Sequence, residues 1–156
     1  MQRLGIHKLD KRATMPKYGT DQAACFDLYA NIPRTYDEAL EEVEFVRLSP
    51  GERVLIPTGL VFDIPEGYSV RLHARSGWAY KYGIILANCE GIIDSDYVEE
   101  IMVMLTNISD EVVYIRHGDR ICQGELVKDE RVVFDVVEER PVKKTNRDGG
   151  FGSTGD

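Results

Sequence analysis

Arg75, Ser76 and Gly77 form a short segment whose chemistry suits a phosphate group. Arginine offers a planar fork of N–H donors to phosphate oxygens, serine adds a hydroxyl, and glycine allows close approach to the backbone. A helix over residues 77–82 would also direct free backbone N–H groups at an anion beside Ser76. As an isolated tripeptide the segment is more typical of a surface loop. A phosphate site is indicated only if other segments of the sequence support it.

Residues 91–97 form the second candidate, in which two isoleucines precede two carboxylates and an aromatic ring. If the chain is extended, Asp94 and Asp96 share one face, whereas in a tight turn they diverge. An aspartate with apolar neighbours can act as the general base for a water molecule. The plainer alternative is a hairpin turn, in which aspartate is common, and this segment alone favours that alternative.

The glycine-rich residues 149–155 form the third candidate, with one aromatic ring and two hydroxyls. Their N–H groups could surround phosphates while Phe151 stacks on a flat ring. The lysine that a P-loop places before its serine or threonine is missing, so this is not a P-loop. A polar, unstructured tail is the simpler explanation, and the segment alone favours it.

Composition restricts the classes of protein to consider. The 156 residues suffice for one domain, and the 43% of hydrophobic residues can bury a core. A formal net charge of −8 gives an acidic surface that repels nucleic-acid backbones, so no nucleic-acid partner is expected. No apolar run approaches the ~20 residues that span a bilayer, and no secretory signal is recognisable, so we expect a cytoplasmic protein without membrane attachment.

Metal-ligand side chains are scattered along the sequence. The three cysteines show no CxxC spacing, and the three histidines are equally dispersed. Reduced, buried cysteines of a cytosolic protein are the ordinary explanation. Because no zinc-ligand pattern is present, no structural metal is expected from Cys25, Cys89, Cys122, His7, His73 and His117.

The elements that must position the three candidate segments are predicted to be short strands. Apolar, β-branched runs alternate with turn residues such as Ser-Pro-Gly and Pro-Glu-Gly, as in an all-β barrel or sandwich. The predicted strands cover residues 43–48, 53–56, 60–64, 68–72, 84–86, 100–105, 112–115 and 131–137.

Two short helices and a tail complete the prediction. Thr35 and Glu38 have the spacing of a capping box, which predicts a helix that continues to Glu42. The second helix is the one over residues 77–82. After Pro141 the chain becomes polar and glycine-rich, so we expect residues 1–141 to form one domain and residues 142–156 a flexible C-terminal arm.

Taken in order, five segments resemble the five motifs of the trimeric dUTPase (dUTP diphosphatase) family. One such motif is weak evidence, but five in the same order over most of a chain are specific. Cys25 stands where the family usually has glycine, and Arg147 lies one residue nearer the final motif than usual. The segments are residues 23–28, residues 75–77, Asn88 with residues 91–97, residues 118–123 and residues 149–155.

The resemblance implies an all-β fold, a distorted jelly-roll β-barrel, with the flexible arm closing a neighbouring subunit's active site. It implies a homotrimer with shared active sites that hydrolyses dUTP to dUMP and pyrophosphate with Mg²⁺. Magnesium keeps most of its waters and binds chiefly through phosphates, so no cage of protein acids is required.

By position, the resemblance also implies residue roles. Asp94 matches the catalytic carboxylate, which activates a water for attack on the α-phosphorus, and Tyr97 matches the ring under the deoxyribose that leaves no room for a 2′-hydroxyl. Asp27 matches an acid that reaches magnesium through water. The remaining substrate contacts fall on the uracil-reading hairpin, the phosphate contacts and the arm, namely Asn88, Gly91, Ile93, Arg75, Ser76, Gly77, Gln123, Arg147, Phe151, Gly152 and Ser153.

Two alternatives remain. The dCTP deaminases share this fold and need a glutamate on the strand after the hairpin, where Met104 stands here, and a thioether cannot transfer a proton. A regulatory binding module is the other alternative, motivated by the acidic insert at residues 36–44, although a solvated surface loop is the plainer explanation.

Overall fold

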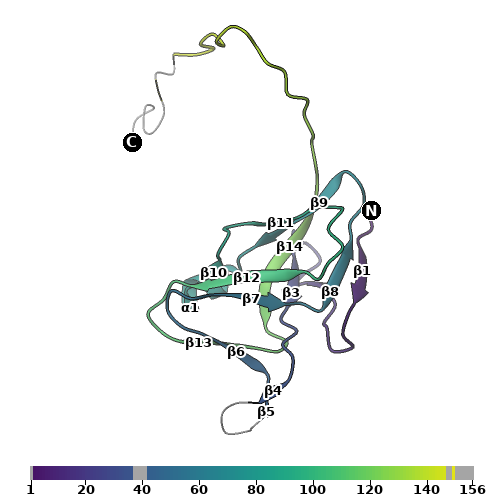
Figure 1. The fold of residues 1–156 in the computed structure, drawn as a ribbon, viewed down its shortest axis with the longest axis vertical. Coiled ribbons are helices and arrows are strands. Elements are labelled where there is room, and N and C mark those ends of the chain that lie inside the picture. Colours follow the sequence, from purple (N-terminus) through teal and green to yellow (C-terminus); the bar gives the residue numbers. More distant parts are fainter. Residues whose placement is uncertain (1, 37–41, 147–148, 150–156) are drawn as a thin grey trace.

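The computed structural model describes residues 2–36, 42–146 and 149. These residues form fourteen strands and one helix (Figure 1). The elements are β1 (Gly5–Lys8), β2 (Lys17–Tyr18), β3 (Phe26–Tyr29), β4 (Thr35–Tyr36), β5 (Glu42–Val43), β6 (Phe45–Leu48), β7 (Arg53–Pro57), β8 (Leu60–Asp63), β9 (Tyr68–His73), α1 (Ser76–Tyr82), β10 (Ile84–Leu86), β11 (Gly91–Ile93), β12 (Met102–Asn107), β13 (Val113–Arg116) and β14 (Arg120–Lys128).

Two antiparallel sheets form most of the body. A five-stranded sheet has the order β11-β9-β14-β3-β2, and a three-stranded sheet has the order β10-β12-β7. Leu28 and Val70 from the first sheet and Ile56 and Leu105 from the second belong to one buried cluster. The burial of alternate residues along β12 shows how a period of two builds this core.

The central strand β14 depends on one glycine. Gly124 pairs with Phe26 of β3, and a Cβ at this position would lie 2.6 Å from the Phe26 ring. Glycine at this position therefore leaves room for the Phe26 ring against the strand. This strand pairs with β9 on one side and with β3 on the other, which brings distant parts of the sequence together.

Helix α1 confirms the prediction over residues 77–82, with a start one residue earlier, at Ser76. The helix ends at Gly83, which has a positive φ of 64° and donates its N–H to the Ala79 carbonyl. A left-handed residue at this position stops a helix, and glycine adopts that conformation without strain. No helix among the described residues is long and apolar enough to cross a membrane.

Most predicted strands are confirmed, but two predictions are wrong. Residues 131–137 form no strand, and Val133, Phe134 and Val136 are 87%, 92% and 97% exposed. Their alternating pattern suits a strand, but no strand within the described part of the chain pairs with these seven residues. The predicted helix at Thr35 is also wrong, because β4 pairs with β5 instead, and residues 37–41 lie outside the described residues.

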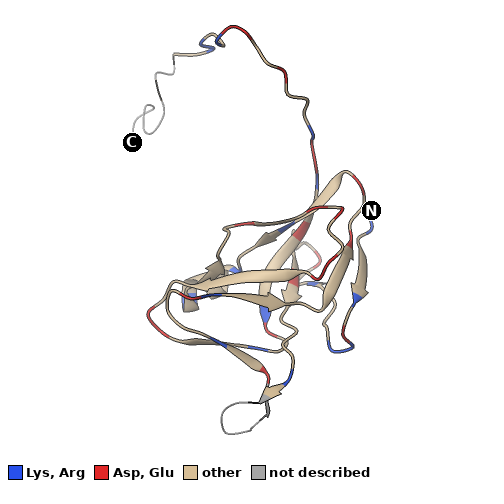
Figure 2. Cartoon of the chain, in the orientation of Figure 1, with Lys and Arg blue, Asp and Glu red and all other residues tan. Residues whose placement is uncertain are grey.

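The sequence prediction missed several strands, of which the longest is β14. Beyond Asp129 the chain leaves the body and runs outward with exposed side chains (Figure 1). Figure 2 shows lysine and arginine interspersed with aspartate and glutamate along both the body and this outward segment.

Candidate active site

A buried carboxylate organises one end of the five-stranded sheet. Asp27 is 4% exposed, and its Oδ1 accepts a hydrogen bond of 3.2 Å from the Gln123 side-chain amide. Its Oδ2 accepts a hydrogen bond of 3.1 Å from the Arg120 guanidinium, and the Arg75 Nε lies 3.4 Å from Oδ1. A buried carboxylate is tolerated when charged donors surround it in this way.

Arg75 connects this cluster to the start of α1. Its Nη1 donates to the Arg120 carbonyl oxygen over 3.1 Å, and its backbone occupies the N-cap position of the helix. Ser76 and Gly77 follow directly and are exposed. Of the predicted phosphate contacts, the fold therefore brings Arg75 and Gln123 to Asp27, and Ser76 and Gly77 follow Arg75 in the chain.

Arg120 is a member of this cluster that the sequence prediction did not single out. Arg120 lies inside the fourth motif segment, residues 118–123, and this position was the sequence signal that could have identified it. Each oxygen of Asp27 accepts one hydrogen bond within the cluster, and its contact with magnesium through water stays a prediction. Asp27 is suited to orient Arg75 and Gln123 toward a ligand.

A small cavity lies between β10 and β11. These consecutive strands belong to different sheets, since β10 pairs with β12 and β11 pairs with β9. They are therefore not hydrogen-bonded to each other as a hairpin. The cavity measures about 100 Å³, and Asn88, Gly91 and Ile93 are among its lining residues. A Cβ at Gly91 would lie 3.0 Å from the Leu72 Cβ, a tight contact that glycine avoids where β11 pairs with β9.

Asp94 begins the turn that follows this cavity. The Tyr97 backbone N–H donates to the Asp94 carbonyl over 3.1 Å, and the Tyr97 hydroxyl donates to the Glu100 carbonyl over 3.0 Å. Asp94 is exposed and borders a second, polar recess of about 680 Å³ that Arg71 and Lys128 also line. The turn thus holds Tyr97 through its backbone and its hydroxyl, and it leaves the Asp94 carboxylate exposed to a ligand.

A single chain does not bring Asp94 and the Arg75 cluster together. Ile93 pairs with Val70 of β9, so Asp94 lies beside the start of that strand, whereas Arg75 follows its end. The five residue steps from Val70 to Arg75 span about 17 Å of extended chain. The predicted arm residues Arg147, Phe151, Gly152 and Ser153 lie outside the described residues.

Comparison with known proteins decides the family. A family model for dUTPase matches residues 11–155. The chain belongs to the dUTPase family. Among relatives named deoxyuridine 5′-triphosphate nucleotidohydrolase, the Finegoldia magna protein is 46% identical over 142 residues, which is 90% of this chain and 91% of that protein. The Nautilia profundicola protein is 42% identical over 154 residues, 98% and 99% of the two chains.

Solved dUTPase structures share the fold. The dUTPase of Staphylococcus bacteriophage 80alpha with dUpNHpp has a TM-score of 0.82 over 100% of both chains, at 24% identity. A mutant dUTPase of phage phi11 of S. aureus has a TM-score of 0.74 over 90% of this chain and 100% of that one, at 23% identity, and coordinates a structural Mg(II) ion. The expectation of an all-β fold of the dUTPase type is confirmed.

The structure also bears on the two alternatives. Met104, which stands where a dCTP deaminase needs glutamate, lines the 100 Å³ cavity and is 38% exposed. A thioether there supplies no proton to a base held in the cavity. Of the insert at residues 36–44, the structure describes the ends: β5 pairs with β4, and Glu44 accepts hydrogen bonds from Arg12 and Arg34.

Proposed function

We propose that the protein hydrolyses dUTP to dUMP and pyrophosphate, with Mg²⁺ arriving on the triphosphate and Asp94 as the general base. The observation that carries this proposal is the 100 Å³ cavity of Asn88, Gly91 and Ile93 followed directly by the Asp94 turn. A base held in the cavity leaves its sugar over Tyr97 and its phosphates beyond, within reach of a water activated by Asp94. Membership of the dUTPase family supports this assignment.

The cavity accounts for the choice of base. Its volume suits a single pyrimidine ring rather than a purine, and its floor consists of apolar side chains such as Leu72 and Leu86. The turn between β10 and β11 uses part of its backbone internally, since Cys89 N–H donates to the Leu86 carbonyl and Glu90 N–H donates to the Asn88 carbonyl. We assign the polar edge of uracil to the remaining backbone groups of this turn. The side-chain amide of Asn88 adds one further donor and acceptor.

The phosphates are assigned to the cluster around Asp27. Phosphoryl transfer needs neutralisation of charge and in-line positioning more than covalent chemistry. Arg75 supplies a positive charge that Asp27 holds in place, and Ser76 and Gln123 add neutral donors. Magnesium, bound through the phosphates and its own waters, would neutralise the rest of the charge.

We infer a homotrimer with shared sites, because one chain separates Asp94 from Arg75 along β9. A second copy can place its Arg75 cluster beside the Asp94 turn of the first. The exposed apolar side chains of the segment 132–137 support assembly, because such a segment suits the surface of another copy. We assign residues 142–156 as the arm that closes a neighbouring site, with Arg147 on the phosphates and Phe151 on the base.

The reaction is tested by pyrophosphate release from dUTP, dCTP, dTTP and UTP with Mg²⁺. Strong release from dUTP alone, abolished by EDTA, is the expected result. Ammonia from dCTP would favour a deaminase instead. No turnover of any of the four nucleotides would overturn the proposed function.

Mixed trimers test the shared site. Asp94→Asn and Arg75→Ala should each be nearly inactive alone, but random mixing should restore roughly a quarter of the sites, because those pair an intact Asp94 with an intact Arg75 from another chain. The measurement is dUTP turnover after the two variants are unfolded together and refolded. If the mixture stays inactive while refolded wild type recovers, each site draws both residues from one chain.

Tyr97→Ala should reduce the preference for dUTP over UTP, measured as the ratio of their kcat/KM values, by roughly tenfold or more, because the ring would no longer exclude a 2′-hydroxyl. Tyr97→Phe is the matched control, since it keeps the ring and removes only the hydrogen bond to the Glu100 carbonyl. An unchanged preference in the alanine variant would refute the role of this ring.

A further inference from the structure

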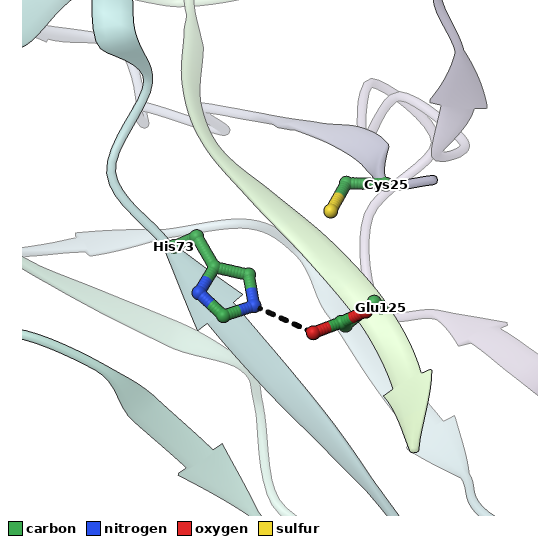
Figure 3. Close-up of side chains that lie close together, drawn as sticks. All are labelled: Cys25, His73 and Glu125. Atoms are coloured by element: carbon green, nitrogen blue, oxygen red, sulfur yellow. Dashed lines mark hydrogen bonds and ion pairs between the residues drawn. The ribbon is translucent and has the colours of Figure 1, made fainter. Parts of the chain in front are cut away.

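Three side chains of ligand type, from distant parts of the sequence, meet on the five-stranded sheet. Cys25 immediately precedes β3, His73 ends β9, and Glu125 lies on β14 between those two strands. Their ligand atoms all lie within 4.8 Å of one another, and all three residues are half-buried. Figure 3 shows the Cys25 sulfur and the His73 ring directed toward the same space beside the Glu125 carboxylate.

The register of β14 explains why the three side chains meet. Gln123 pairs with His73 on one side and with Asp27 on the other. Residues two apart along a strand project from the same face. Glu125, two residues after Gln123, and Cys25, two residues before Asp27, therefore project from the face that carries His73.

The two nitrogens of His73 have different surroundings. Nε2 lies 3.0 Å from a Glu125 oxygen, whereas Nδ1 points to the other side, 3.7 Å from a Glu90 oxygen. Histidine ligands of metals usually direct their second nitrogen at a carboxylate, which fixes the tautomer and the orientation of the ring. Arg71 holds Glu90 in turn, with 3.5 Å between their charged groups.

We propose that Cys25, His73 and Glu125 form a binding site for a thiophilic divalent metal ion such as Zn²⁺, with a fourth position open to water. Thiolate, imidazole and carboxylate are the three ligand types that zinc takes in proteins, and three protein ligands with one open position is a common set. Bonds of about 2.0–2.3 Å place the ligand atoms of a tetrahedral site about 3.5 Å apart, so small side-chain rotations suffice to close the cluster.

The chemistry separates this site from the magnesium of the substrate. Magnesium prefers oxygen ligands, whereas a cysteine sulfur selects softer ions. On binding, the Cys25 thiol releases its proton to solvent and the thiolate bonds to the metal. The charged groups around the ion are then Glu125, Glu90 and Arg71.

The other two cysteines provide the comparison. Cys122 is fully buried, and burial raises the pKa of its thiol to about 12, so it stays protonated. Cys89 is exposed in the turn between β10 and β11 and is not a member of the cluster. Cys89→Ser is therefore a matched control for Cys25→Ser, with the same atoms exchanged at a cysteine outside the proposed site.

The test is a titration of the metal-free, full-length protein with Co²⁺ in excess Mg²⁺, followed by the thiolate-to-cobalt charge-transfer absorption. The expected result is one Co²⁺ per chain with this band, which Zn²⁺ then abolishes by displacement. Cys25→Ser should remove the band and weaken Co²⁺ binding at least about tenfold, and Glu90→Gln should weaken binding by about tenfold while the band persists. Cys89→Ser should leave the band and the affinity unchanged.

Three outcomes overturn the site. These are a titration with no charge-transfer band, a band that survives Cys25→Ser, and a band that disappears with Cys89→Ser. Circular dichroism of each variant confirms that the sheet is intact, so that a lost band reports the ligand and not the fold. None of these measurements involves dUTP, so their result is independent of the proposed hydrolysis.

Discussion

Asp94→Asn should lower kcat for dUTP by about 10²–10⁴-fold, the usual effect of removing a positioned general base. The amide keeps the size and shape of the carboxylate but cannot take the proton of the attacking water. Because Asp94 is exposed at the start of a turn, the substitution should leave the fold and the 100 Å³ cavity unaffected. The measurement is steady-state turnover of dUTP with saturating Mg²⁺.

Two controls make this prediction specific. Asp96→Asn changes an exposed aspartate two residues away, in the same turn, and should alter kcat by less than about threefold. Binding of dUpNHpp to the Asp94 variant should be retained, since a base that acts in the transition state contributes little to ground-state binding. If Asp94→Asn turns over dUTP at the wild-type rate, another group is the base.

A chain that ends at Lys144 should still form trimers but lose roughly 10²-fold or more in dUTP turnover. The assembly surface proposed at residues 132–137 is retained in this chain, whereas Arg147 and Phe151 are removed. Without them, the phosphates and the base lose the groups proposed to hold them in line, and imprecise positioning alone can cost about this factor. Sedimentation gives the oligomeric state, and pyrophosphate release gives the rate.

Phe151→Ala in the full-length chain separates the two parts of this prediction. If base stacking is the main contribution of the arm, this variant should reproduce most of the loss. If the phosphate clamp dominates, Arg147→Ala should do so instead. Full activity of the truncated chain would show that the glycine-rich segment is only a tail, which its composition alone favours.

Sequence patterns sufficed for the parts of the site that are local. The segment from Gly91 to Tyr97 contains its own turn, so its residue types already specify the Asp94 turn that the structure shows. Helix α1 was predictable for the same reason, since Gly83 stops it and no distant contact is needed. The arrangement of Asn88 and Ile93 around one cavity followed only from the structure.

Contacts that depend on strand pairing were not predictable. Strand β14 was missed because Gln123, Gly124 and Glu125 interrupt its apolar pattern, although it lies at the centre of the five-stranded sheet and pairs with both β9 and β3. The Cys25, His73 and Glu125 cluster was hidden for a related reason. Its members are 48 and 52 residues apart in sequence, and only the register of three strands joins them.

The opposite error occurred at residues 131–137, where an apolar alternation predicted a strand that the chain does not form. An apolar alternation indicates that a segment can form a strand, but it does not specify which strand or surface pairs with that segment. The same ambiguity affected Thr35, whose capping-box spacing suggested a helix although β4 pairs with β5.

The exposed segment at residues 132–137 has a consequence for how the proposed trimer would form. A newly folded chain presents Val133, Phe134 and Val136 to other chains before any partner is bound, and such a segment promotes aggregation. Asp135 interrupts the run with a charge, as gatekeeper residues do. In the proposed trimer, assembly would compete with aggregation for the same surface, so the melting temperature should rise with protein concentration, and Asp135→Val should lower the soluble yield.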